Sequence, residues 1–148
     1  VVNALSTRLD IQVDRGGNRY EQTYLDGGKP QADMQQAGQT PASGRETGTS
    51  ITFYPDAGIF QAEGTEFVAR TVLDRLQIMA FLNKGLEIVF KDERPEREQD
   101  VTFQYKGGLV DFVKHLNASK EPLFSKVCNF EDEDVEEGME LDIAMQWN

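Results

Sequence analysis

The sequence predicts an α+β fold. Several segments alternate polar and apolar residues, as half-buried strands do, and a few have apolar residues three and four positions apart, as amphipathic helices do. No internal repeat is visible along the chain. A chain of 148 residues suits one ordinary domain, or two lobes that share a sheet-rich core.

Strands are predicted where polar and apolar residues alternate, or where β-branched and aromatic residues gather. The first two form a hairpin, because Gly16-Gly17 lies between them and glycines permit the positive φ angles of tight turns. The polar stretch 39–47 is expected to be a mobile loop. The predicted strands cover residues 8–14, 19–25, 31–36, 48–54, 86–90, 101–105, 127–130 and 139–147.

Two helices are predicted, over residues 65–82 and 109–116. Thr65 is expected to cap the longer one, with Glu66 at the positive end of the helix dipole and Gly85 just beyond its end. One face of the longer helix is expected to pack on the core. The residues of this face are Val68, Val72, Leu76, Met79 and Ala80.

Charge and cysteine content exclude several classes of protein. The 15 Lys and Arg residues stand against 26 Asp and Glu, for a net charge of −11, so we expect poor binding to DNA and to anionic membranes. The single cysteine excludes an internal disulfide framework and fits a reducing cytoplasm. No apolar run approaches the roughly 20 residues that span a bilayer. The N-terminus has no signal-peptide pattern and no Met, and suggests a piece of a longer chain.

Single residues offer little chemistry of their own. Neither common glycine-rich phosphate motif is present. His115 fits a partly exposed helix position better than a catalytic dyad, and Cys128 fits a small buried residue better than a nucleophile. The acidic run 131–137 departs from the calcium-loop template and fits a solvated loop. Thr49 is the polar residue best suited to a role, although a strand-edge threonine without one fits the pattern better.

A series of short motifs, in one order from end to end, resembles the gyrase B family of type II topoisomerase ATPase subunits in the GHKL superfamily. The ATPase subunit of topoisomerase IV shares many of them. The motifs are Val1–Ser6, Thr47–Thr49, Phe53–Asp56, Thr65–Phe67, Ala80–Gly85, Asp92–Arg94, Tyr105–Val113 and Ala144–Asn148.

The resemblance implies two incomplete domains. Residues 1–107 would be the C-terminal part of a GHKL ATP-binding domain, a sandwich with a mixed sheet and helices on one face, and residues 108–148 the start of a transducer domain. The full-length enzyme would use ATP and Mg²⁺, and would couple hydrolysis to DNA supercoiling and strand passage. Its partners would be a second copy of gyrase B, the gyrase A protein and DNA.

The resemblance assigns few functional residues to this chain. The family's general base, its Mg²⁺-binding Asn and its adenine-binding Asp would precede Val1, and its transducer lysine would follow Asn148. Only Thr49 and Ile51 carry over, as walls of the ATP pocket, with no catalytic and no metal-binding residue. We therefore expect the isolated chain neither to hydrolyse ATP nor to bind DNA well. A non-catalytic acidic protein-binding module is the alternative.

Overall fold

The computed structural model describes residues 1–40 and 47–148, apart from the side chains of residues 62 and 63. Most of the loop predicted over 39–47 lies outside the described residues. The chain forms two compact units, Val1–Phe67 and Val68–Asn148, and each is described by itself. The domain boundary expected at Gly107–Gly108 lies inside the second unit and stays a prediction.

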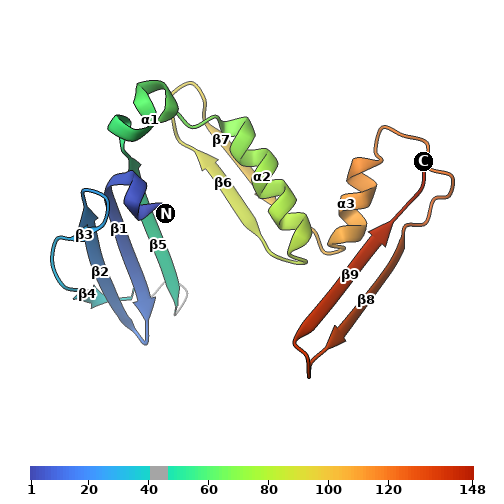
Figure 1. Ribbon diagram of the computed structural model, residues 1–148, viewed down its shortest axis with the longest axis horizontal. Helices are drawn as coiled ribbons and strands as arrows, with labels where there is room; N and C mark the ends of the chain where they lie inside the picture. Colours follow the sequence, from blue (N-terminus) through green and yellow to red (C-terminus); the bar gives the residue numbers. More distant parts are fainter. Residues whose placement is uncertain (41–46) are drawn as a thin grey trace. The chain divides into compact units, whose positions relative to one another are not determined.

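The first unit is an antiparallel sheet with a short helix after it (Figure 1). The strands follow the order β3-β2-β1-β5, and β4 also pairs with β2. The elements are η1 (Asn3–Leu5), β1 (Ser6–Arg15), β2 (Asn18–Leu25), β3 (Lys29–Pro30), β4 (Gln35–Gln39), β5 (Gly48–Pro55) and α1 (Ala57–Gly64).

The predicted hairpin and the strand at 48–54 are confirmed. Gly16 and Gly17 both have positive φ, at 59° and 78°, which suits a two-residue turn whose twist matches that of the strands. The strand predicted over 31–36 is wrong in its bounds, because β4 begins only at Gln35. Residues 31–39 are all exposed, so no buried face imposes an alternation that could mark the strand.

The sheet of the first unit has one polar and one mainly apolar face, because successive side chains of a strand point to opposite sides. We call the two sides the polar face and the apolar face. The polar face carries Arg8, Asp10, Gln12, Asp14, Arg19, Glu21, Thr23, Ser50 and Thr52. The apolar face carries Leu9, Ile11, Val13, Tyr20, Tyr24, Thr49, Ile51 and Phe53.

The second unit combines two helices with two antiparallel hairpins (Figure 1). Strand β6 pairs with β7, and β8 with β9. The elements are α2 (Ala69–Leu82), β6 (Ile88–Asp92), β7 (Gln99–Phe103), α3 (Leu109–Leu116), β8 (Cys128–Asp134) and β9 (Met139–Met145). The shorter helix was therefore predicted correctly, and the strands of the first hairpin lie about two positions from their expected bounds.

The longer helix begins at Ala69, and the expected cap at Thr65 is wrong. Thr65 instead ends α1, a helix that the sequence pattern did not indicate. Asp56 caps α1, since its carboxylate accepts a hydrogen bond of 2.7 Å from the Gly58 amide. The ring of Phe67 packs edge-on against Phe53 at 6.0 Å. This contact holds the residues before Ala69 against the sheet, so they do not extend α2.

Phe81 forms the core of the second unit and is 2% exposed. Its ring stacks on Tyr105 at 3.6 Å and lies 5.3 Å from the ring of Phe112. The predicted core face of the helix is therefore only partly correct. Ala80 is buried, whereas Val68 and Met79 are 62% and 51% exposed. The stacking of Phe81 on Tyr105 directs the helix face that carries Phe81 toward the core. The spacing of the aliphatic residues did not include Phe81.

The acidic run is mostly strand, and its prediction as a loop is wrong. Residues Glu131–Asp134 belong to β8, and the turn is confined to 135–138. The Asp134 carboxylate holds this turn by accepting hydrogen bonds of 3.0 Å from the amides of Glu136 and Glu137. Cys128 is exposed rather than buried. The buried residue at this point is its neighbour Val127, which is 4% exposed.

Candidate functional site

Thr49 and Ile51, the two residues predicted to line a ligand pocket, lie on the apolar face of the first unit. They are two positions apart on β5 and stand opposite Val13 and Ile11 of β1, so their side chains point to the same side. Ile51 is 57% exposed. The structure thus brings the two residues together on an open surface with a hydroxyl beside an aliphatic side chain.

A small apolar pocket lies at the end of this face, where β5 runs toward α1. Its volume is about 190 Å³, and it is lined by Val2, Leu5, Ser6, Phe53, Pro55, Phe60, Gly64 and Phe67. The Ser6 hydroxyl already donates a hydrogen bond of 2.8 Å to the Val2 carbonyl. The pocket therefore presents apolar surface, and Phe53 connects it to the face that carries Thr49 and Ile51.

The polar face is a network of bonded side chains. Arg8 donates to Asp10 at 2.8 Å, and Asp10 also accepts a bond of 2.7 Å from the Thr23 hydroxyl. The Arg19 guanidinium donates hydrogen bonds of 2.8 Å to both carboxylate oxygens of Asp14. These hydrogen bonds, chiefly from the arginines, lower the pKa of Asp10 and of Asp14. The network ties β1 to β2 and holds both carboxylates in the charged form.

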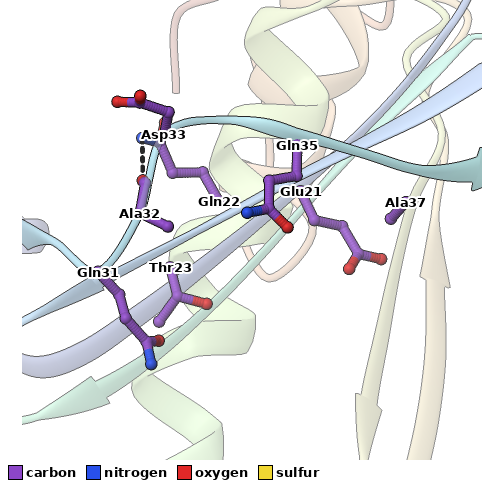
Figure 2. A pocket seen from close by; sticks show the side chains of 8 residues that line it. All are labelled: Glu21, Gln22, Thr23, Gln31, Ala32, Asp33, Gln35 and Ala37. Atoms are coloured by element: carbon purple, nitrogen blue, oxygen red, sulfur yellow. Dashed lines mark hydrogen bonds between the residues drawn. The ribbon is translucent and has the colours of Figure 1, made fainter.

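Figure 2 shows a polar groove of about 400 Å³ beside β2. It is lined by Glu21, Gln22, Thr23, Gln31, Ala32, Asp33, Gln35 and Ala37. The Gln22 side-chain amide donates a hydrogen bond of 3.2 Å across the groove to the Ala32 carbonyl. This bond holds the segment between β3 and β4 against the sheet. The sequence pattern did not indicate this groove, because residues 31–36 were predicted to form a strand.

The described residues hold no evident catalytic centre. His115 is exposed on α3, and its ring contacts Phe81 at 5.3 Å, as expected of a structural helix residue. No three His, Cys, Asp or Glu side chains come together as a possible metal-ligand set within 1–40 and 47–148. In the same part of the chain, no helix has both the length and the apolar character needed to cross a bilayer.

Sequence comparison relates the whole chain to bacterial and archaeal topoisomerase subunits. It is 42% identical to the DNA gyrase B protein of Haloferax volcanii over 146 residues, which are 99% of this chain and 22% of that protein. It is 37% identical to the DNA gyrase B protein of Mycobacterium tuberculosis, over 100% of this chain and 25% of that protein. The chain is a homologue of part of DNA gyrase B.

A topoisomerase IV protein is about as similar in sequence to this chain as the gyrase B relatives are. The corresponding protein of DNA topoisomerase 4 from Streptococcus pneumoniae is 39% identical over the whole chain and 22% of its own length. The chain thus spans about a quarter of the curated relatives that it matches. No family model matches the sequence. The alternative of an unrelated acidic binding module leaves this whole-length relationship to gyrase B unexplained.

Solved structures agree with the gyrase B relationship. The 43K ATPase domain of Thermus thermophilus gyrase B, in complex with an aminocoumarin, matches with a TM-score of 0.78 and 29% identity over 90% of this chain and 35% of that one. The B-subunit of the Myxococcus xanthus DNA gyrase shares the fold, with a TM-score of 0.82 over 98% of this chain and 40% of that one. The expected α+β fold of GHKL type is confirmed.

Proposed function

We propose that this chain forms part of the ATP-binding and transducer region of a gyrase B protein, a type II topoisomerase component that couples ATP hydrolysis to DNA supercoiling and strand passage. The observation that carries the proposal is the relationship to gyrase B over the whole chain, at 37–42% identity. In this proposal residues 1–107 belong to the ATP-binding domain, and the transducer domain begins at Gly108.

Within this function, Thr49 and Ile51 form one wall of the ATP pocket. An apolar surface with a few placed polar groups is the usual lining of a nucleotide site. On the apolar face, Ile51 supplies aliphatic surface for the base and Thr49 supplies a hydroxyl that can hydrogen-bond to its edge. ATP supplies the phosphoryl group for hydrolysis and Mg²⁺ neutralises its charge. The residues that hold Mg²⁺ and the phosphates would belong to other parts of the enzyme, whereas Thr49 and Ile51 would contact only the base.

The same proposal includes the partners of the full-length enzyme. They are a second copy of gyrase B, the gyrase A protein and DNA, in the cytoplasm. With a net charge of −11, this chain would contribute little to phosphate contacts, because DNA affinity depends on cationic side chains. DNA binding would belong to other parts of the assembly.

Exchanging the homologous segment of a gyrase B protein tests the pocket wall. The 148 residues replace the matching part of Haloferax volcanii gyrase B, and nucleotide affinity is measured by calorimetry for the exchanged protein and two variants. Thr49→Ala is expected to weaken ATP binding about three- to tenfold, the value of one hydrogen bond. Ser50→Ala is the matched control, because Ser50 lies on the opposite face of the same strand.

The two variants separate a role in the pocket from a general effect on the strand. Equal affinity for Thr49→Ala and the exchanged parent protein would contradict the assignment of Thr49. A similar loss for Ser50→Ala would show that any substitution on β5 disturbs the fold. Thermal unfolding of each variant shows whether the exchanged protein stays folded.

A further inference from the structure

The second unit contains a joint at Lys106–Gly108, between β7 and α3. Gly108 has a φ of 54° and a ψ of −125°, a conformation that residues with a side chain rarely adopt. The Gly107 amide donates a hydrogen bond of 2.9 Å to the Asp111 carboxylate. A Cβ added at Gly107 would lie 2.6 Å from the oxygens of that carboxylate. The backbone conformation thus favours glycine at Gly108, and a side chain at Gly107 would displace the Asp111 carboxylate. Both positions lie where α2, β6 and β7 on one side meet α3, β8 and β9 on the other.

An aromatic contact forms the pivot of this joint. Phe81 of α2 stacks on Tyr105, which precedes the glycines, and its ring lies 5.3 Å from Phe112 of α3, which follows them. Aromatic pairs tolerate a range of offset and tilted arrangements, so this packing keeps the two sides together and restrains the angle between them only loosely. A second, directional contact is needed to fix that angle.

Lys84 lies on the first side of the joint, in a loop that is hydrogen-bonded to the two residues that follow β7. The Gly85 amide donates a hydrogen bond of 2.9 Å to the Tyr105 carbonyl, and the Gln104 side chain donates one of 3.1 Å to the Gly85 carbonyl. The aliphatic stem of Lys84 lies against Gly108, since a Cβ added there would be 3.4 Å from the Lys84 Cβ. Movement at the glycines must therefore displace Lys84.

Lys84 reaches across the joint to the β8–β9 hairpin, which carries the acidic run 131–137 and is called the acidic hairpin below. Its Nζ lies 2.8 Å from the Glu131 carboxylate of β8. Glu131 stands directly opposite Asp142 of β9, and like charges in such a pair repel each other. The two carboxylates raise the pKa of Lys84, chiefly through its hydrogen bond with Glu131. Lys84 thus offsets a repulsion within the hairpin while it connects the two sides.

We propose that the Lys84–Glu131 ion pair is a latch that fixes the angle between the two sides of the Gly107–Gly108 joint. When the pair opens, the α3–β8–β9 side swings about the Phe81 pivot. The latch follows from contacts within this chain. Its use, to relay the state of the nucleotide to the transducer, rests on the proposed function.

Spin-label distances across the joint test the latch in the 148-residue chain. The lone cysteine, Cys128, is exposed at the start of β8 and takes one nitroxide label. Thr102→Cys on the exposed side of β7 takes the other. Double electron–electron resonance is recorded for this protein and for Lys84→Glu. The charge reversal is expected to raise the population at longer distances about two- to fivefold, as the loss of an exposed ion pair allows.

Two further variants and a salt series make the result specific. Lys84→Glu combined with Glu131→Lys reverses the pair and is expected to restore the parent distribution. Lys91→Glu is the matched control. It breaks an ion pair of similar exposure, Lys91 with Asp100 at 3.4 Å, which lies within the β6–β7 hairpin and does not cross the joint. Raising NaCl from about 0.05 M to about 1 M is expected to open the unmutated latch by screening.

An unchanged distribution in Lys84→Glu and at high salt would overturn the latch. A broadening in Lys91→Glu equal to that in Lys84→Glu would also overturn it, as would failure of the reversed pair to restore the parent distribution. None of these measurements uses a nucleotide. Loss of the proposed function, seen in the affinity of the exchanged gyrase B, can therefore be distinguished from failure of the latch.

Discussion

At the scale of single residues, Asp92 shows how a local contact changes the chemistry of a side chain. Asp92 is 8% exposed, and its carboxylate accepts hydrogen bonds from both the backbone amide and the guanidinium of Arg94. These bonds, chiefly those from the guanidinium, lower the pKa of Asp92 from 3.8 to about 2. The pair fixes the start of the turn that follows β6.

This pKa shift predicts a pH dependence of stability. An unfolded Asp titrates near pH 4, so the contribution of the pair is complete above about pH 4 and is lost as the pH falls toward about 2. The free energy of unfolding, measured with urea at several pH values, should decline more steeply over this range in the parent chain than in Asp92→Asn.

The exposed pair of Lys91 and Asp100 provides the control. Its side chains are 59% and 62% exposed at 3.4 Å, and solvent screens such a pair. Asp100→Asn is expected to follow the pH profile of the parent chain. Parallel profiles for the parent chain and Asp92→Asn would refute the role given to Arg94.

Side-chain burial was harder to predict from the sequence than the elements that carry it. The helical spacing identified Ala80 as a core residue, but it also selected Met79 and omitted Phe81, the centre of the second unit. The spacing of apolar residues in the sequence indicates which of them share a helix face. It does not record that Tyr105, more than twenty positions away, supplies a ring for Phe81 to stack on. Tertiary contacts of this kind decide burial.

At the scale of elements, the acidic hairpin differs most from its prediction. Charged residues are depleted in strands, so the run 131–137 was expected to be a loop. Backbone pairing with β9 nevertheless continues to Asp134 opposite Met139. The register sets Glu133 directly opposite Glu140, an unfavourable pair of like charges. The length of these strands was not visible in the sequence.

The cross-strand register predicts the effect of one charge reversal. Glu133→Lys replaces a repulsion with Glu140 by an attraction and should raise the free energy of unfolding by about 0.2–1 kcal/mol. Thermal and urea unfolding at low salt measure the gain. Glu137→Lys changes the net charge equally, but lies in the turn at 135–138 without a cross-strand partner in the β8–β9 ladder. Equal stabilisation by both variants would show that net charge, not register, is responsible.

At the scale of the whole molecule, the sequence predicted the fold class and the family, and the domain boundary at Gly107–Gly108 stays a prediction. The Gly16-Gly17 turn and the alternation of polar and apolar residues marked the β1–β2 hairpin correctly. The order of short motifs predicted a gyrase B relationship that the comparisons confirm. The helix α1, which begins after the Asp56 cap, was missed, and the contact of Phe67 with Phe53 keeps the residues before Ala69 out of the longer helix. Thr49 and Ile51 lie on one face of β5, and their role in the pocket stays a prediction.

ATP hydrolysis by the exchanged Haloferax volcanii gyrase B is the most direct measurement of whether these residues belong to an ATP-binding and transducer region. We expect magnesium-dependent hydrolysis by the protein that carries the 148 residues in the homologous position, and none by the 148-residue chain alone. A folded exchanged protein that neither binds nor hydrolyses ATP, or steady turnover by the isolated chain, would contradict it.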